Sequence, residues 1–291
     1  MKQAACPVVS NAEIMPGVHL MWIEAPDMAC SVQPGQFITV QCGGFTLRRP
    51  FSVHQVSSSD IALLFKVTGK GTIWLSQQQS GERIDVLGPL GNGFTVPPRQ
   101  SGQSKHLLLV AGGIGIAPLV FLMQYASSQH QVTLIHGAST AAQLYPWSIL
   151  NTGPSSVTRK QSKPASLPER VQFIPVTEDG SMGKKGMVTD ILPDFLDRAD
   201  QVYACGPLQM YKAMAGVTCH SECSEKSHGT PGWLGRESKL KKCQVSLEVR
   251  MGCGFGACYG CTINTRKGLK QVCRDGPVFE LDDIIWQEVK L

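Results

Sequence analysis

Four cysteines near the C-terminus are the residues of this chain whose type and spacing point most directly to chemistry. The segment reads M-G-C-G-F-G-A-C-Y-G-C, and V-C-R-D-G-P follows. Four, two and eleven residues separate the successive sulfurs of Cys253, Cys258, Cys261 and Cys273. A C-x4-C-x2-C run with a later fourth cysteine is a ligand spacing of [2Fe-2S] clusters. The interleaved glycines let backbone amides turn toward thiolate and sulfide acceptors. The spacing therefore predicts an iron–sulfur electron carrier.

Zinc and disulfides are the alternatives for these thiols. Structural zinc sites favour paired C-x2-C hooks, and in this cysteine set only Cys258 and Cys261 form one. Disulfides need an oxidising compartment, but the N-terminal M-K-Q-A-A-C-P-V-V-S lacks the apolar core of an export signal. The final gap is shorter than in plant-type ferredoxins, which predicts a reduced version of that ligand loop. The spacing favours iron–sulfur over both alternatives.

Length and composition indicate a cytoplasmic protein of several modules. The chain has 291 residues, eleven cysteines and a net charge of +5. That length fits two or three modules, and many thiols without an export signal favour a reducing cytoplasm. The basic run at 236–242 has no interleaved aromatic residues, so we expect no nucleic-acid partner. The longest apolar run, 107–123, is broken by glycines and a proline, so we expect no membrane span.

The pattern of apolar residues differs between the first hundred residues and the part that follows. Residues 1–100 hold six short β-branched and aromatic runs separated by Pro and Gly, which favours a closed antiparallel barrel. In residues 101–218, longer apolar runs alternate with helical segments, which predicts an α/β domain with a parallel sheet. We expect a linker at 219–242 and a small cluster domain at 243–291. The Ser- and Pro-rich segment 151–170 is expected to be a surface loop.

Two short segments of the barrel half combine cations, tight turns and hydroxyls. R-P-F-S sets an arginine beside a rigid proline and a small hydroxyl, which can hold a flavin diphosphate and keep the backbone extended beside the ring. G-K-G-T follows a lysine and supplies a tight turn and a free hydroxyl for the same diphosphate at a helix start. R-P-F-S alone is a weak signal, because such runs occur by chance in many strands and loops, and a barrel hairpin followed by an ordinary helix explains the lysine and G-K-G-T equally well. The residues concerned are Arg49, Pro50, Phe51, Ser52, Lys66, Gly71 and Thr72.

Two glycine-containing motifs in the α/β half suit a dinucleotide. G-G-I-G-I-A-P-L, at 112–119, is a strand-to-helix turn that lets a phosphate approach backbone amides. It is not G-x-G-x-x-G, and a plain tight turn is the alternative. C-G-P ends a later strand of the same sheet, where its cysteine could touch a nicotinamide ring or be a small buried thiol. The candidate residues are Gly112, Gly113, Gly115, Cys205, Gly206 and Pro207.

The order of these motifs resembles the ferredoxin–NADP reductase superfamily. R-P-F-S, G-P-L-G-N-G-F (88–94), G-G-I-G-I-A-P and C-G-P follow one another over about residues 5–215. C-Q-V-S-L-E-V-R-M-G-C-G-F-G-A-C-Y-G-C, with V-C-R-D-G-P-V-F after it, closely resembles the electron-transfer subunits of NAD-dependent, class 1B dihydroorotate dehydrogenases. T-E-D-G-S-M-G-K-K-G-M-V-T-D, at 177–190, fits the same family. The chain departs from it in a longer stretch between Met214 and Cys243 and in the 151–170 segment.

The resemblance implies a complete set of cofactors and partners. The R-P-F-S and G-K-G-T residues would hold FAD in the barrel, the four cysteines would ligate a [2Fe-2S] cluster, and the two glycine-containing motifs would line the NAD site. The implied activity is that of an oxidoreductase subunit of pyrimidine biosynthesis. It passes electrons from the FMN of a catalytic partner, which oxidises dihydroorotate to orotate, through the cluster and FAD to NAD⁺. Two copies of each subunit would form a heterotetramer, and no residue of this chain is expected to act as a catalytic acid, base or nucleophile.

Elementary redox chemistry supports that order of carriers. A nicotinamide exchanges two electrons at once, a cluster exchanges one, and FAD can do both, so FAD must lie between them. The exposed glycine-rich cluster loop is the expected docking surface. One rival function is the FAD/[2Fe-2S] reductase subunit of a hydrogenase or of a ferredoxin:NADP oxidoreductase complex. Another is a non-catalytic zinc-bearing interaction protein. H-G-A-S-T at 136–140 lacks an arginine for a 2′-phosphate, which favours NAD over NADP.

Overall fold

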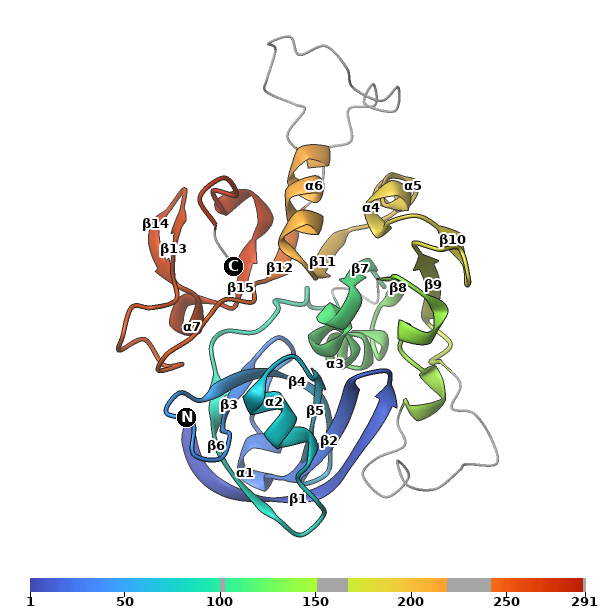
Figure 1. Cartoon of the computed structure of the whole chain (residues 1–291). Helices are drawn as coiled ribbons and strands as arrows, with labels where there is room; N and C mark the ends of the chain where they lie inside the picture. The colour runs from blue at the N-terminus through green and yellow to red at the C-terminus, as the bar shows by residue number, and fades with distance from the viewer. Residues whose placement is uncertain (100–102, 151–166, 219–241, 290–291) are drawn as a thin grey trace.

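The computed structural model describes residues 1–99, 103–150, 167–218 and 242–289 (Figure 1). Two segments predicted from composition, the surface loop at 151–170 and the linker at 219–242, lie almost wholly outside these residues. Among the described residues no helix is both long and apolar enough to cross a membrane.

Six antiparallel strands close into a barrel at the N-terminal end of the chain, as predicted. Along the sixth strand, buried residues alternate with more exposed ones, because successive side chains of a strand point to opposite faces. The inward set forms a separate apolar core, to which Met21, Val40 and Val86 belong. The elements are β1 (Lys2–Met15), β2 (Val18–Glu24), β3 (Phe37–Gln41), β4 (Arg49–Ser57), β5 (Asp60–Lys66), β6 (Arg83–Leu90), α1 (Pro26–Ala29) and α2 (Lys70–Ser76).

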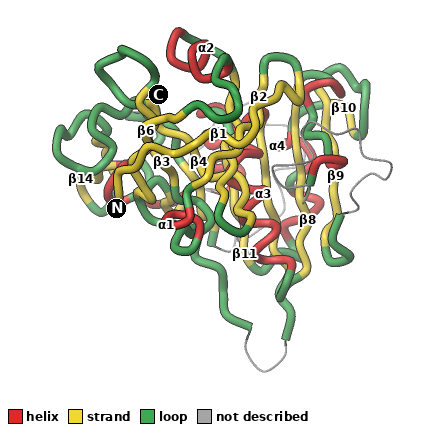
Figure 2. The backbone as a smooth tube through the Cα atoms, turned by 90° about the horizontal axis from the view of Figure 1, so that it is seen from below, coloured by secondary structure: helices red, strands yellow, loops and turns green. Residues whose placement is uncertain are grey.

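A seven-stranded sheet follows, with the order β10-β9-β8-β7-β11-β12-β15. All neighbouring strands are parallel except β15, which runs antiparallel to β12 at one edge. The predicted parallel sheet is therefore confirmed, and Figure 2 shows its strands beside the barrel. The strands are β7 (His106–Gly112), β8 (Gln131–Ala138), β9 (Val171–Thr177), β10 (Lys184–Lys185), β11 (Gln201–Cys205), β12 (Cys243–Ser246) and β15 (Val278–Glu280).

Apolar side chains cover both faces of this sheet, which explains the continuous apolar runs in its strands. On β7, Leu107 and Leu109 face a core that they share with the first long helix, while Leu108 and Val110 face the opposite core. In Figure 1 α3 lies between the sheet and the barrel, and α4, α5 and α6 lie beyond the sheet. The helices are α3 (Ile116–Ser127), α4 (Val188–Ile191), α5 (Pro193–Leu196) and α6 (Leu208–Thr218), with 3₁₀ segments at Gly113–Gly115, Ala141–Gln143 and Trp147–Ile149.

The cysteine-bearing C-terminal segment is built onto the large sheet. Its first and last strands, β12 and β15, extend that sheet, and its apolar residues share a core with β11 and α6. The remaining elements are a hairpin of β13 (Thr262–Thr265) and β14 (Gly268–Gln271), the short helix α7 (Val272–Asp275) and a 3₁₀ segment at Leu281–Asp283. The domain boundary at residue 243 stays a prediction, and the structure shows that the two sides of it share a sheet.

The G-P-L-G-N-G-F motif forms the junction between the barrel and the cysteine-bearing segment. The side-chain amide of Asn92 donates to the carbonyls of Asp275 (3.0 Å) and Val278 (2.9 Å), and its oxygen accepts the Val278 N–H (3.0 Å). The backbone N–H of Asn92 also donates to Gly276 at 2.6 Å. Gly91, at φ +69°, leaves room for this contact, because a Cβ there would press on Gly276 and Pro277. The motif thus fixes the segment against the barrel.

A buried polar network joins the barrel to the α/β half. On β4, His54 contacts the Ala117 carbonyl of α3 through Nδ1 (2.8 Å) and the Tyr145 hydroxyl through Nε2 (3.0 Å). The side-chain amide of Gln55 also donates to that hydroxyl, at 3.1 Å. On β8, Nε2 of His136 contacts the Gly113 carbonyl at 3.1 Å. Burial lowers the pKa of both histidines to about 4, although each hydrogen bond to a carbonyl opposes the effect. Both rings are therefore neutral at physiological pH.

The two buried histidines predict how stability depends on pH. An unfolded histidine titrates near pH 6.5, so between pH 6.5 and about 4 the unfolded chain binds more protons than the folded chain. Stability therefore rises with pH through this window and is lost as pH falls through it, by roughly 3 kcal/mol for each histidine. Denaturant unfolding at pH 7 and pH 4.5 measures the loss. In His54→Gln the free energy of unfolding lost between pH 7 and pH 4.5 should be smaller by about the contribution of one histidine. An unchanged loss would show that His54 is not buried in its neutral form.

Candidate functional site

A cleft of about 500 Å³ opens between the barrel and the glycine-rich turn that leads into α3. Met15 and Pro16 line it from the turn between β1 and β2, and Val188 lines it from α4. The structure brings six of the predicted residues together here. They are Lys66, Gly112, Gly113, Gly115, Gly206 and Pro207. Lys66, which the sequence assigned to the flavin diphosphate, thus lies in the same cleft as the glycines of the predicted nucleotide site.

The glycines of this cleft are required by close backbone contact. A Cβ on Gly115 would overlap the carbonyl of Cys205, and a Cβ on Gly112 would lie 2.7 Å from Cδ of Pro207. Gly113 adopts φ +53°, the left-handed region that glycine enters at little cost. The G-G-I-G turn and the C-G-P turn, which are about 90 residues apart in sequence, are therefore in direct contact. Backbone amides at the start of α3 thus lie beside the cleft, which suits a phosphate.

Cys205 lies beneath the cleft. Its side chain is only 1% exposed, and burial raises the pKa of its thiol well above the usual range. Nearby, the Tyr211 hydroxyl accepts the Gly206 N–H (2.9 Å) and donates to the Ser246 carbonyl (2.6 Å). This contact ties the C-G-P turn to the strand that leads into the cysteine-bearing segment. The contact between Cys205 and a nicotinamide ring stays a prediction. Its thiol is kept protonated by burial.

Two glutamates of the cleft are absent from the set predicted from sequence. Glu178, at the end of β9, accepts a hydrogen bond from the Ser139 hydroxyl at 3.0 Å. Glu248, just after β12, is open to the cleft, yet the surrounding protein desolvates its carboxyl group and raises its pKa. Each lies in a motif quoted above, T-E-D-G or S-L-E. Glu178 directly follows a strand of the parallel sheet, at the carboxyl edge where ligands bind such sheets, and that position could have identified it.

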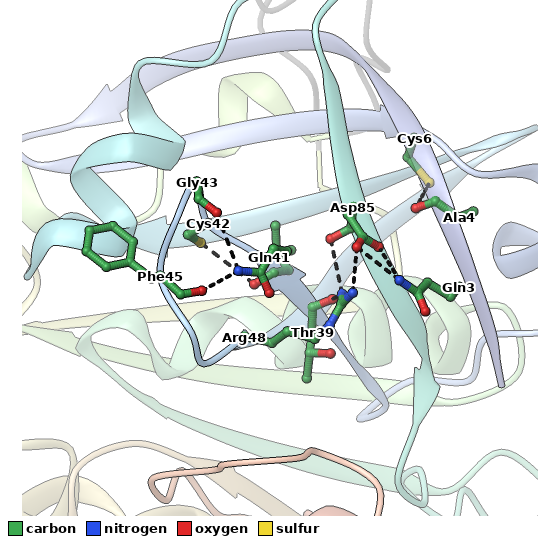
Figure 3. Close-up of polar contacts among 11 residues, drawn as sticks. Gln3, Ala4, Cys6, Thr39, Gln41, Cys42, Gly43, Phe45, Arg48 and Asp85 are labelled. Atoms are coloured by element: carbon green, nitrogen blue, oxygen red, sulfur yellow. Dashed lines mark hydrogen bonds and ion pairs between the residues drawn. The ribbon is translucent and has the colours of Figure 1, made fainter.

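In the barrel, two adjacent arginines have different surroundings. Arg48 forms an ion pair with Asp85 (Nη2 to Oδ2, 2.6 Å), and Gln3 donates to the same carboxylate (Figure 3). Its Nη1 also donates to the Asp85 carbonyl at 3.3 Å. Arg49 lies against the first turn of α2, where a Cβ on Gly71 would be 3.1 Å from its Nε. Among the described residues no carboxylate pairs with Arg49. Arg48 is therefore engaged by a carboxylate, whereas Arg49 donates through Nη1 to the Leu47 carbonyl at 2.8 Å, and its contact with a flavin diphosphate stays a prediction.

The rest of the predicted flavin residues lie on β4 and at the start of α2. Pro50 and Ser52 pair with Thr39 and Phe37 of β3, and the Phe51 ring lies 5.6 Å from that of Phe65. The expectation of a free hydroxyl at Thr72 is wrong. Its oxygen accepts the N–H groups of Thr68 (2.9 Å) and Gly69 (3.1 Å) and donates to the Gly69 carbonyl. The hydroxyl therefore closes the turn at the start of α2, and a contact of Thr72 with FAD stays a prediction.

The four cysteines of the C-terminal segment meet as two pairs. Cys253 is hydrogen-bonded to Cys258, and Cys261 to Cys273. The second pair is buried, whereas Cys258 is exposed. Backbone N–H groups point at three of the sulfurs, from Ala257 to Cys253 (3.2 Å), from Gly260 to Cys258 (3.5 Å) and from Cys273 to Cys261 (3.4 Å). Glycines at 252, 254, 256 and 260 make this wrapping possible, with φ +83° at 254 and +93° at 256.

This donor set fits a [2Fe-2S] cluster. Burial opposes ionisation of Cys253, but hydrogen bonds from the backbone amides of Phe255 and Cys258 outweigh it and lower the pKa of Cys253 to about 6. A thiolate is the form that binds metal. In the described part of the chain, no three His, Cys, Asp or Glu side chains gather closely enough to hold a single metal ion. Each iron of a [2Fe-2S] cluster takes two protein ligands, so two pairs of thiols suit it better than they suit a tetrahedral zinc ion.

Comparison with solved structures agrees with this architecture. The chain matches the structure described as "Insights into flavin-based electron bifurcation via the NADH-dependent reduced ferredoxin-NADP oxidoreductase structure", with a TM-score of 0.76 and 26% identity over 98% of this chain and 91% of that chain. A ferredoxin NADP⁺ reductase from Neisseria gonorrhoeae with bound FAD and NADP matches at a TM-score of 0.55 and 19% identity, over 74% of this chain and 90% of that chain. The second likeness shows the shared fold of barrel and sheet.

Comparison of sequences covers almost the whole chain. Residues 109–216 match the oxidoreductase NAD-binding domain, and residues 248–285 match the iron-sulfur cluster binding domain of dihydroorotate dehydrogenase B. A dihydroorotate dehydrogenase B (NAD(+)) electron transfer subunit of Desulforamulus reducens is 36% identical, over 94% of this chain and 95% of that one. The same subunit of Caldanaerobacter subterraneus is 35% identical, over 96% and 97%. The chain therefore belongs to the family of dihydroorotate dehydrogenase B (NAD(+)) electron transfer subunits.

Proposed function

We propose that this chain carries electrons to NAD⁺ from a partner subunit that oxidises dihydroorotate to orotate on its own FMN. The observation that carries the proposal is that one chain combines three groups of residues suited to a nucleotide, a flavin and a cluster. These are the cleft beside the G-G-I-G turn, the guanidinium of Arg49 beside α2, which no carboxylate of the described residues pairs with, and the two pairs of cysteine thiols. The full-length similarity to electron transfer subunits supports the same function. The partner is the FMN-containing catalytic subunit, and we propose a heterotetramer with two copies of each.

Each site has a role in this proposal. FAD exchanges two electrons with a nicotinamide and single electrons with an iron–sulfur cluster, which is the chemistry that a chain with both neighbouring sites needs. Arg49 would bind the FAD diphosphate, with Gly71 leaving space for the arginine side chain. Cys253, Cys258, Cys261 and Cys273 would ligate the cluster. The glycine turns would bind NAD(H), with Lys66 supplying a cation to the same cleft.

The surface around Cys258 suits docking of the partner. Cys258 is exposed, and the side chains of Phe255 and Tyr259 on the same loop are 48% and 69% exposed. Tyr259 adopts φ +59°, a left-handed conformation that is unfavourable for a bulky residue and holds this loop in a tight turn between two cluster ligands. An aromatic surface next to the exposed thiol pair would bring the partner's flavin near the cluster while excluding water.

A second candidate function keeps the same cofactors. The chain also matches the structure of an NADH-dependent reduced ferredoxin-NADP oxidoreductase over 98% of its length. A reductase subunit of such a complex would use the same three sites with a different partner. Co-purification from the native host distinguishes the two functions, because only the first predicts an FMN-containing partner whose dihydroorotate oxidation reduces NAD⁺. Recovery of a colourless, zinc-containing protein would contradict both.

Cys258→Ser tests the assignment of the cluster. The variant should lose the broad thiolate-to-iron absorption and retain the flavin bands, because Arg49 and the thiols lie on separate elements. NADH oxidation by an artificial acceptor should continue, while dihydroorotate-dependent NAD⁺ reduction with the partner should fail. Cys30→Ser, at an exposed thiol of the barrel, is the matched control and should change neither activity. Loss of FAD together with the cluster would mean that the cluster also holds the barrel in place.

The adjacent arginines make a matched pair for the flavin site. Arg49→Ala should lower the FAD content of the purified protein with little effect on unfolding of the apoprotein, because Arg49 has no carboxylate partner among the described residues. Arg48→Ala breaks the ion pair with Asp85 and should destabilise the apoprotein by about 1–3 kcal/mol. Flavin absorbance per protein and denaturant unfolding measure the two effects. Loss of FAD in Arg48→Ala and loss of stability in Arg49→Ala would instead assign the diphosphate contact to Arg48.

Glu178 predicts a preference for NAD over NADP. A carboxylate at the end of β9 can accept a ribose hydroxyl and repels a 2′-phosphate. NADH should therefore give a much higher kcat/KM than NADPH in diaphorase assays, and Glu178→Gln should narrow the ratio by about tenfold, mainly through the KM for NADPH. Comparable efficiency of the unmutated protein with both nucleotides would contradict the preference.

A further inference from the structure

His136 lies directly behind the glycine turn of the cleft. It belongs to β8, and the next three residues, Gly137, Ala138 and Ser139, line the cleft themselves. Its own ring is fully buried and contacts the turn from the protein side, with Nε2 3.1 Å from the Gly113 carbonyl oxygen. Its other nitrogen, Nδ1, lies 3.4 Å from the backbone N of Tyr145. The ring therefore spans the space between the turn and the segment that follows β8.

The partners of His136 determine its tautomer. A carbonyl oxygen can only accept, so Nε2 carries the hydrogen and donates it to Gly113. Nδ1 is then an acceptor and takes the N–H of Tyr145. Both nitrogens are satisfied in the neutral ring, and burial keeps the ring neutral. A protonated His136 would leave a second donor facing the Tyr145 N–H, so the neutral form alone fits this arrangement.

Two hydrogen bonds hold the carbonyl of Gly113, one from Nε2 of His136 and one from the Ile116 N–H at the end of the 3₁₀ segment. Gly113 has φ +53°, and its carbonyl is directed to the buried ring. A carbonyl that faced the cleft would repel a phosphate, whereas amide N–H groups attract one. Holding the Gly113 oxygen inside the protein therefore leaves the N–H groups of Ile114 and Gly115, just before α3, as polar groups available on this side of the cleft.

The same network extends to the barrel. The Tyr145 hydroxyl donates to Nε2 of His54, because Nδ1 of His54 must carry the hydrogen that goes to the Ala117 carbonyl. Ala117 lies in the first turn of α3, directly after the glycine turn. His54 lies on β4, two residues after Ser52 of the predicted flavin segment. Two buried histidines thus hold the start of α3, one from the sheet and one from the barrel.

We infer that His136 is a positioning residue for the pyridine nucleotide, which anchors the Gly113 carbonyl so that the amides of the turn are presented to the nucleotide diphosphate. The inference rests on the proposed function of the cleft as the NAD(H) site. Through Tyr145 and His54, the same network fixes the turn relative to the β4 strand of the barrel. His136 itself does not touch the nucleotide, so its removal weakens binding without altering the reacting groups.

A matched pair of substitutions separates the two hydrogen bonds of the ring. In His136→Gln, the amide nitrogen can occupy the position of Nε2 and keep the bond to Gly113. In His136→Asn, the shorter side chain can replace Nδ1 toward Tyr145 but does not reach Gly113. With FAD and cluster loaded, titration with NADH should give a Kd about tenfold higher for His136→Asn and near that of the unmutated protein for His136→Gln. The KM for NADH should rise in parallel, with kcat and flavin content unchanged.

The outcomes separate this inference from the proposed function. If the unmutated protein does not bind NADH, the function assigned to the cleft fails. If it binds NADH and both variants bind equally well, the positioning role fails while the function stands. Hydrogen–deuterium exchange of the amides at Ile114 and Gly115 in the unmutated protein gives a test that needs no substitution. Because these N–H groups face the open cleft, bound NADH should slow their exchange, and exchange that bound NADH leaves unchanged would contradict their contact with the nucleotide.

Discussion

The structure depends on the burial of α3 between the parallel sheet and the barrel. One side of this helix packs toward Leu107 and Leu109 of β7, and the other contacts β4 and β5 of the barrel, where Ala62 and Leu64 belong to the same continuous core. Because apolar surface on both sides is removed from water by the same helix, the two halves are held as a unit. The glycine turn that begins α3 therefore lies at the boundary of barrel and sheet, which is where the cleft opens.

Polar contacts then fix the positions that apolar packing alone would leave adjustable. Burial of apolar surface is not directional, whereas hydrogen bonds to His54, Tyr145 and His136 require defined distances and angles. Asn92 does the same at the other end of the barrel, where its side chain is bonded to three backbone groups of the segment that follows Cys273. The flavin, nucleotide and cluster sites that we propose are thus connected through buried contacts, as transfer of electrons over fixed distances requires.

The sequence predicted the modules well and their connections poorly. Alternation and apolar runs correctly indicated the barrel and the parallel sheet, because each pattern reflects which faces of a strand are buried. The sharing of one sheet by β12, β15 and the α/β domain was not predicted. These strands are only four and three residues long, and pairing with β11 depends on contacts far along the chain. The pattern of residue types likewise does not predict that the Thr72 hydroxyl is hydrogen-bonded within its own turn.

The sequence by itself determined the chemistry, because that depends on residue type and local spacing. The four cysteines and their glycines specify a [2Fe-2S] donor set wherever the segment lies, and the order of the motifs specifies the family. Only the tertiary structure decided which of two adjacent arginines pairs with a carboxylate, since Asp85 comes from β6, 37 residues away. It also showed that Lys66 lines the cleft and that His136 lies behind Gly113. Such assignments arise from contacts between distant strands, which a local pattern does not encode.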